Sequence, residues 1–149
     1  MDSEKIKNRI KSLKEESKGH FGIMTPQHMI EHLTITMKMS SARIKLPDFE
    51  PNEKQLAQKD LLLNTFLDFP RGIRAPGSTG ELPDLKMQNL EIAKEKFITS
   101  IEEFNSFFED NPEAQTIHPR FGKLNYREWL LFHPKHFAHH LGQFGISFD

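Results

Sequence analysis

The sequence contains no cysteine, and it has only one tryptophan and one tyrosine among 149 residues. The absence of cysteine excludes disulfide bonds, cysteine-based zinc sites and thiol nucleophiles. An excess of charge is missing as well, since 20 lysines and arginines face 21 aspartates and glutamates, which gives a formal net charge of −1. Nucleic-acid binding usually requires a clearly basic domain, so we expect no nucleic-acid partner.

Long hydrophobic runs are absent too. Residues 1–16 are too polar for the hydrophobic part of a secretion signal, and the longest apolar runs, such as 129–132, are far too short to cross a bilayer. We therefore expect a cytoplasmic protein with no membrane partner. The chain length predicts one domain spanning residues 1–149, which is large enough to bury a core without covalent cross-links.

Strand patterns are scarce, because no stretch alternates apolar and polar residues over five or more positions with β-branched enrichment. The apolar spacing instead predicts helices that are separated by prolines and glycines. The expected helices span residues 3–16, 26–43, 52–69, 85–108 and 125–143. They favour an all-α, antiparallel four-helix bundle with one additional short helix. The segment 70–84 holds three prolines and three glycines and is expected to be a long loop across the end of the bundle.

Two of the expected helix starts carry recognisable caps. Thr25 is a good N-cap with Pro26 at the first helical position, and residues 125–128 form a capping-box sequence. Pro134 conflicts with the last helix. It removes a hydrogen bond to the Leu130 carbonyl and crowds that carbonyl, which costs roughly 3 kcal/mol in a straight helix. We expect a kink near residues 130–134, or a break at which Pro134 restarts the helix.

Histidine is plentiful, with eight in the chain and five of them between positions 118 and 140. His136 and His140 are four residues apart, so on a helix their Cβ atoms lie about 5–6 Å apart, which suits two imidazoles that bind one metal ion. His32 is the better third ligand in the helix expected at 26–43. We expect it to lie on an inward-facing stripe with Ile35 and Met39.

Other residues could hydrogen-bond the metal-binding histidines or contact a substrate. Gln143, one turn beyond His140, could hydrogen-bond an imidazole or a bound ligand. His28 and His133 are candidates for the same role or for contact with a substrate, although the direction of His133 cannot be read because it precedes a proline. By contrast, we expect His20 and His118 to lie on the surface.

Charged residues add few further candidates. Glu31 and Glu128 could accept hydrogen bonds from the ligands, but the capping box already explains Glu128. Arg71 and Arg74 in the long loop could contact an anionic substrate, although solvation at the surface is the favoured explanation for both. No residue stands out as a general base.

Three interpretations of the histidines stay open. Three imidazoles would leave a divalent ion with its full charge and an open coordination position, which is the pattern of a catalytic site. Such an ion would lower the pKa of a bound water toward about 7 and would attract a thiolate or carboxylate. The alternatives are a metal- or ligand-binding module without turnover, and a histidine cluster that is purely structural.

Two segments resemble known protein sequences. Residues 24–33 (MTPQHMIEHL) resemble the second helix of the DinB-like superfamily, and residues 136–143 (HFAHHLGQ) resemble its last-helix signature. Residues 118–124 and the ending HHLGQFG are similar to a branch that is described only as a domain of unknown function.

The resemblance implies a four-helix bundle in which His32, His136 and His140 hold a divalent metal ion. Nickel, zinc, iron and manganese are all candidates for that ion. The resemblance also implies a metal-dependent thiol S-transferase or hydrolase that acts on a small-molecule substrate, with a thiol as one candidate. A second copy of the chain, forming a homodimer, is the macromolecular partner that we consider.

Overall fold

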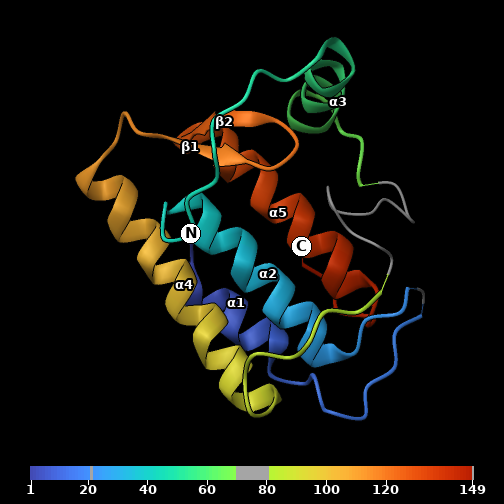
Figure 1. Ribbon diagram of the computed structural model, residues 1–149. Helices are drawn as coiled ribbons and strands as arrows, with labels where there is room; N and C mark the ends of the chain where they lie inside the picture. The colour runs from blue at the N-terminus through green and yellow to red at the C-terminus, as the bar shows by residue number, and fades with distance from the viewer. Residues whose placement is uncertain (21, 70–80, 149) are drawn as a thin grey trace.

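The computed structural model describes residues 1–20, 22–69 and 81–148. These residues form five helices and one two-stranded sheet, so the described chain is mainly helical (Figure 1). In chain order the elements are α1 (Ser3–Ile10), α2 (Pro26–Ser40), α3 (Glu53–Asn64), α4 (Leu90–Asp110), β1 (Gln115–His118), β2 (Gly122–Asn125) and α5 (Tyr126–Gly142).

The core lies where α2 meets α4 and α5. Figure 1 shows α2 between these helices, with α1 packed against α4 and α3 set apart at the edge. The largest fully buried side chains of the core include Trp129, Phe97, Phe104, Phe137, Met29, Ile30 and Leu33. Because α2 and α5 run in opposite directions, the first half of α2 lies beside the last half of α5.

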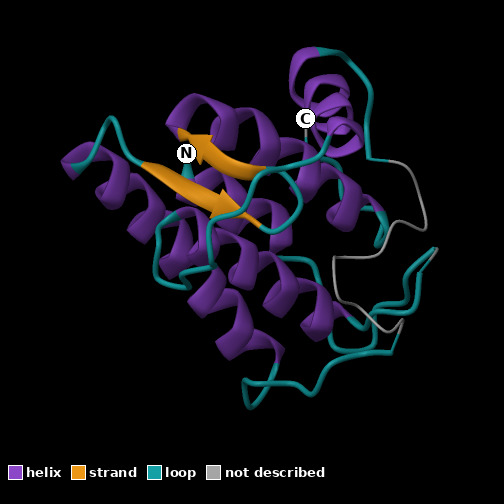
Figure 2. Ribbon diagram, turned by 45° about the horizontal axis from the view of Figure 1, so that its top comes forward, coloured by secondary structure: helices purple, strands orange, loops and turns teal. Residues whose placement is uncertain are grey.

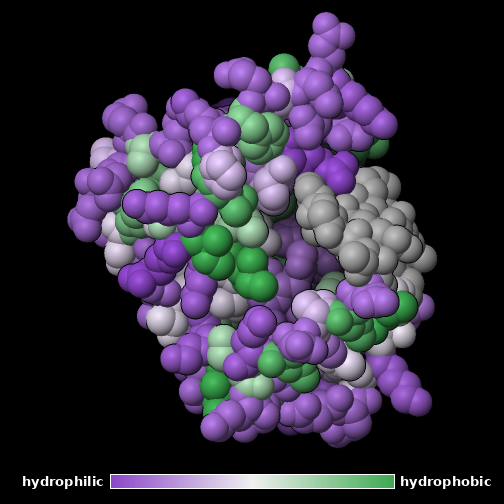
Figure 3. Space-filling view, in the orientation of Figure 1, coloured by the Kyte–Doolittle hydropathy of each residue, from purple (hydrophilic) through white to green (hydrophobic). Residues whose placement is uncertain are grey.

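Hydrophilic residues cover most of the face in Figure 3, as expected for side chains that contact water. None of the helices in the described part of the chain is long and apolar enough to pass through a bilayer.

The first two helices are shorter than the periodicity predicts. The helix expected over 3–16 ends at Ile10, after which the chain turns so that Leu13 is buried and its carbonyl oxygen accepts a hydrogen bond from Lys94 Nζ at 2.6 Å. The helix expected over 26–43 ends at Ser40, because Ala42 adopts a left-handed conformation with φ of 60°.

The next two helices also differ at their ends. The helix expected over 52–69 spans only Glu53–Asn64, with Asn52 as its N-cap. The helix expected over 85–108 begins at Leu90 because Asn89 caps it. The residues before it form a loop instead, with the backbone N–H groups of residues 86 and 87 bound to the Glu31 carboxylate.

The predicted caps of α2 and α5 are confirmed. Thr25 Oγ1 accepts a hydrogen bond from the His28 backbone, and Asn125 and Glu128 form a complete capping box. Of the kink or break expected at Pro134, the break is wrong, because α5 continues through the proline as one helix. α5 packs against α2, α3 and β2, and this packing offsets the cost of the hydrogen bond that the proline removes.

The sequence did not predict the β-hairpin. Strands β1 and β2 pair antiparallel, with Thr116 opposite Leu124, and each is only four residues long. Figure 2 shows the hairpin lying over the helices, between the end of α4 and the start of α5. Buried polar contacts hold it there, since Trp129 Nε1 donates to Thr116 Oγ1 at 2.7 Å and that hydroxyl donates to the Ser40 carbonyl oxygen at 2.9 Å.

Candidate metal centre

Three histidines from two helices converge at one point; we call His32, His136 and His140 the three-histidine cluster. One ligating nitrogen from each lies within 4.8 Å of the other two. The Nε2 atoms of His32 and His136 are 3.0 Å apart, and the ring centroids of His32 and His140 are 4.7 Å apart. The cluster forms because the antiparallel arrangement places the middle of α2 beside the last two turns of α5.

All three imidazoles of the cluster are neutral at pH 7. Burial lowers the pKa of His32 from 6.5 to about 4, and it lowers the pKa of His140 to about 3. Burial also holds the pKa of His136 well below 6.5, and repulsion from a charge on His140 lowers it further. A neutral imidazole has one nitrogen lone pair available for a metal ion, so protons do not compete with a metal in this cluster at neutral pH.

Gln143 fixes the tautomer of His140. Its Oε1 lies 3.1 Å from His140 Nδ1, and since a carbonyl oxygen accepts, the imidazole carries its proton on Nδ1 and presents a bare Nε2. The Gln143 amide is confined on its other side by Gly22, where a Cβ would lie 3.2 Å from Nε2 and where φ is +81°. A side chain at position 22 would therefore be strained and would displace Gln143.

Two residues considered as site residues from the sequence make their contacts away from the three-histidine cluster. The His28 ring contacts Thr25 Oγ1 at 2.6 Å and the Pro83 carbonyl oxygen at 3.0 Å, and it is not part of the three-histidine cluster. Glu31 accepts hydrogen bonds from the Lys86 backbone at 2.6 Å and from Gln27 Nε2 at 2.9 Å, so its carboxylate fixes the loop before α4.

Glu128 likewise serves its capping box and an ion pair with Lys59 at 2.8 Å. The predicted inward stripe on α2 is only partly right, because Ile35 is 38% exposed. Arg71 and Arg74 lie outside the described residues.

His118 and His133 are buried, contrary to the surface position predicted for His118. The Nδ1 of His118 accepts hydrogen bonds from the backbone N–H groups of Arg120 and Phe121 at 3.0 and 3.2 Å, which is why this histidine stabilises the hairpin turn. His133 stacks between Trp129 and Phe137, with ring centroids at 5.0 and 5.7 Å. His20 is exposed, as predicted.

Phe69 is a wall of the site that sequence reasoning missed. Its ring centroid lies 5.5 Å from that of His136 and 5.6 Å from that of His139. Lys135 holds the segment before it, because its ammonium group donates to the carbonyl oxygens of Leu62, Thr65 and Leu67. No periodic pattern marks these residues, since Phe69 lies in an irregular segment.

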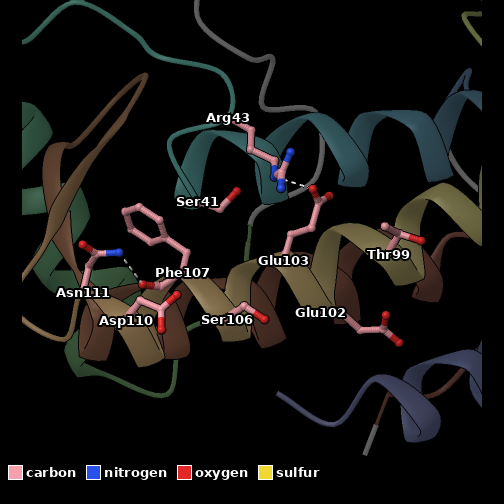
Figure 4. Close-up of a pocket in the computed structure, with 9 residues that line it drawn as sticks. All are labelled: Ser41, Arg43, Thr99, Glu102, Glu103, Ser106, Phe107, Asp110 and Asn111. Atoms are coloured by element: carbon pink, nitrogen blue, oxygen red, sulfur yellow. Dashed lines mark hydrogen bonds and ion pairs between the residues drawn. The ribbon is translucent and has the colours of Figure 1, made fainter.

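A separate cavity of about 450 Å³ lies beyond the end of α2 and against the second half of α4 (Figure 4). Most of its lining residues are of polar type, and two of them, Arg43 and Glu103, form an ion pair. None of the residues of the three-histidine cluster lines this cavity.

One comparison with known proteins gives a match. The model of a family described as "Protein of unknown function (DUF1569)" matches residues 2–146. No curated protein and no solved structure matches the chain.

Proposed function

We propose, for a chain that belongs to the DUF1569 family of proteins of unknown function, that His32, His136 and His140 bind one divalent metal ion in a metal-dependent enzyme. The observation that carries this proposal is the convergence of three neutral imidazoles from two helices, two of them buried and that of His32 half-buried. The further assignment to the DinB-like superfamily and its four-helix bundle is part of the proposal. Its support is that the three histidines which the resemblance implies as metal ligands lie close together in the fold.

The cluster fits a metal ion in size and chemistry. Zinc binds imidazole nitrogen at about 2.0–2.1 Å, so ligand nitrogens around a tetrahedral ion lie roughly 3.3 Å apart. The nitrogens of the cluster are 3.0 Å apart in one pair and within 4.8 Å in all pairs. The His140 tautomer that Gln143 selects is the one that a ligating Nε2 requires. Imidazole suits zinc, nickel and iron, and manganese also stays a candidate.

The residues around the cluster define what it could hold. A divalent ion there would lower the pKa of a bound thiol or water and so supply a nucleophile at neutral pH. His32, His136 and His140 would fix its position, and Gln143 would orient His140. Phe69 would exclude water on one side and offer an apolar contact to the substrate. We propose a small-molecule substrate, with a thiol as the first candidate, and a thiol S-transferase or hydrolase reaction.

A binding protein without turnover is the second candidate, and one observation favours it. Glu31 is the acid nearest to His32 in the sequence, and its carboxylate is engaged by Gln27 and the backbone of residues 86 and 87. No aspartate or glutamate joins the three-histidine cluster within the described residues. The site therefore offers imidazoles to a metal but no evident carboxylate general base.

Turnover distinguishes the two candidates. We expect the metal-loaded wild-type protein to transfer or hydrolyse at least one member of a panel of low-molecular-weight thiols, electrophiles and esters. His136→Ala should lose that activity while retaining its helical circular dichroism. Activity that survives in His136→Ala would belong to a contaminant or to another site. A metal-loaded protein that is inactive across the panel would favour the binding protein.

A further inference from the structure

The buried histidine His133 has a tautomer that its surroundings determine. Its Nε2 lies 2.9 Å from Ser40 Oγ, and the Ser40 hydroxyl already donates its proton to the Met37 carbonyl oxygen at 2.7 Å. Ser40 can therefore only accept from His133, so the proton of this imidazole is on Nε2. The Nδ1 of His133 is left as a bare acceptor, and it is buried without a hydrogen-bond partner among the described residues.

In His136, by contrast, the nitrogen that lacks a partner is a hydrogen-bond donor. If His136 binds the proposed metal ion through the Nε2 that faces His32, its proton must be on Nδ1. In the described part of the chain, that Nδ1 is also buried without a hydrogen-bond partner. His140 differs, because Gln143 accepts from its Nδ1. A histidine that binds a metal almost always donates its other N–H group to an acceptor, so His136 lacks a contact that its proposed role requires.

The two unpartnered atoms belong to neighbouring side chains of one helix. His133 and His136 are three residues apart on α5, and side chains at that spacing are neighbours on the helix surface. The nearby groups are mostly apolar: Trp129, Phe104 and Phe137 contact the ring of His133, and Phe132 and Phe69 contact that of His136. Among the described residues, one ring therefore offers an unused acceptor and its neighbour an unused donor, and no direct hydrogen bond joins them.

We propose that His133 is a positioning residue for His136, and that one enclosed water molecule accepts from His136 Nδ1–H and donates to His133 Nδ1. A single water can bridge polar atoms that are too far apart for a direct bond, and buried waters typically occupy sites with such partners. The chain of contacts then runs from His136 through the water to His133, Ser40 and the Met37 carbonyl oxygen. This inference rests on the proposed metal site, and it anchors that site to α2 through a second route.

The tautomers of the wild-type protein test the proposal without any substitution. In the zinc-loaded, ¹⁵N-labelled protein, long-range ¹H–¹⁵N correlation spectra should show His133 with its proton on Nε2 and His136 with its proton on Nδ1. His118 serves as an internal reference, because two backbone N–H groups bind its Nδ1 and its proton must be on Nε2. A proton on Nδ1 of His133 would overturn the proposal.

A pair of variants separates positioning from packing. His133→Phe keeps an aromatic ring but removes the acceptor, and it should weaken zinc binding about 10–100-fold. His133→Asn places an amide oxygen near the former Nδ1 and should recover part of that loss, although it packs less well. Equal zinc affinity in wild type and His133→Phe would overturn the inference but leave the metal site intact. A wild-type protein that binds no zinc would instead refute the proposed function itself.

Discussion

Replacing His32 with alanine should remove most of the stabilisation that a divalent ion gives to the wild-type protein. His32 is the ligand that α2 contributes, and without it the two imidazoles of α5 are left alone. Structural zinc sites release about 10–16 kcal/mol, so one of four ligands contributes roughly 3 kcal/mol, or more than a hundredfold in affinity. His32 is also the least buried of the three, so its loss disturbs the fold least.

The measurement is urea unfolding with and without added zinc or nickel. At a hundred times its dissociation constant, the ion should raise the free energy of unfolding of the wild-type protein by about 2.7 kcal/mol. At the same concentration, His32→Ala should gain roughly 0.4 kcal/mol or less. His20→Ala is the matched control, because it removes an exposed histidine and should keep the wild-type gain. A full gain in His32→Ala would show that the ion binds elsewhere.

Acid should destabilise the metal-free protein steeply. Burial, together with a smaller effect of repulsion from Arg120, lowers the pKa of His118 to about 3, and burial lowers the pKa of His133 to about 3. In the unfolded chain both imidazoles titrate near 6.5, so below that pH the unfolded state binds protons that the folded state excludes. The stabilisation is complete above pH 6.5 and is lost as the pH falls from there toward 3.

The expected slope follows from the two buried imidazoles. Each lowers the free energy of unfolding by up to about 1.4 kcal/mol per pH unit, so together they contribute roughly 3 kcal/mol per unit between pH 6 and 4. The histidines of the cluster act in the same direction when no metal is bound. Urea unfolding at a series of pH values measures the slope. His133→Phe should reduce it by up to about 1.4 kcal/mol per unit, whereas His20→Gln should not change it.

A flat dependence between pH 6.5 and 5 would contradict the burial of these histidines in solution. An unchanged slope in His133→Phe would contradict the role of His133 alone. Both outcomes can be measured even if His133→Phe is less stable than the wild type, because the comparison uses the change in the free energy of unfolding with pH and not its absolute value.

The sequence predicted those features that depend on local spacing. The caps at Thr25 and Asn125 are set by neighbouring side chains, and the core positions of α4 follow a regular helical period. The approach of His32 to His136 could be anticipated because each lies on a helix beside a second histidine four residues away. The distance between the two rings depends on how closely α2 packs against α5 and in which register, and the spacing of the histidines does not encode this.

The features that were missed depend on contacts between distant segments. The four-residue strands of the hairpin are too short to show an alternating pattern, and Trp129 and Ser40 hold them through Thr116. His118 follows no helical period, so its burial against Phe132 and Phe121 could not be read from the sequence. The position of Phe69 beside the site also depends on a contact between distant segments. Lys135 on α5 fixes the segment before Phe69 by donating hydrogen bonds to its backbone carbonyl oxygens.

The metal content of the untagged protein tests the central claim most directly. Elemental analysis after purification and loading with nickel, zinc, iron or manganese should give one bound ion per chain. An anomalous difference map of the same protein should show its peak between the nitrogens of His32, His136 and His140. A protein that retains none of these four ions, or a peak at a different place in the fold, would contradict the account.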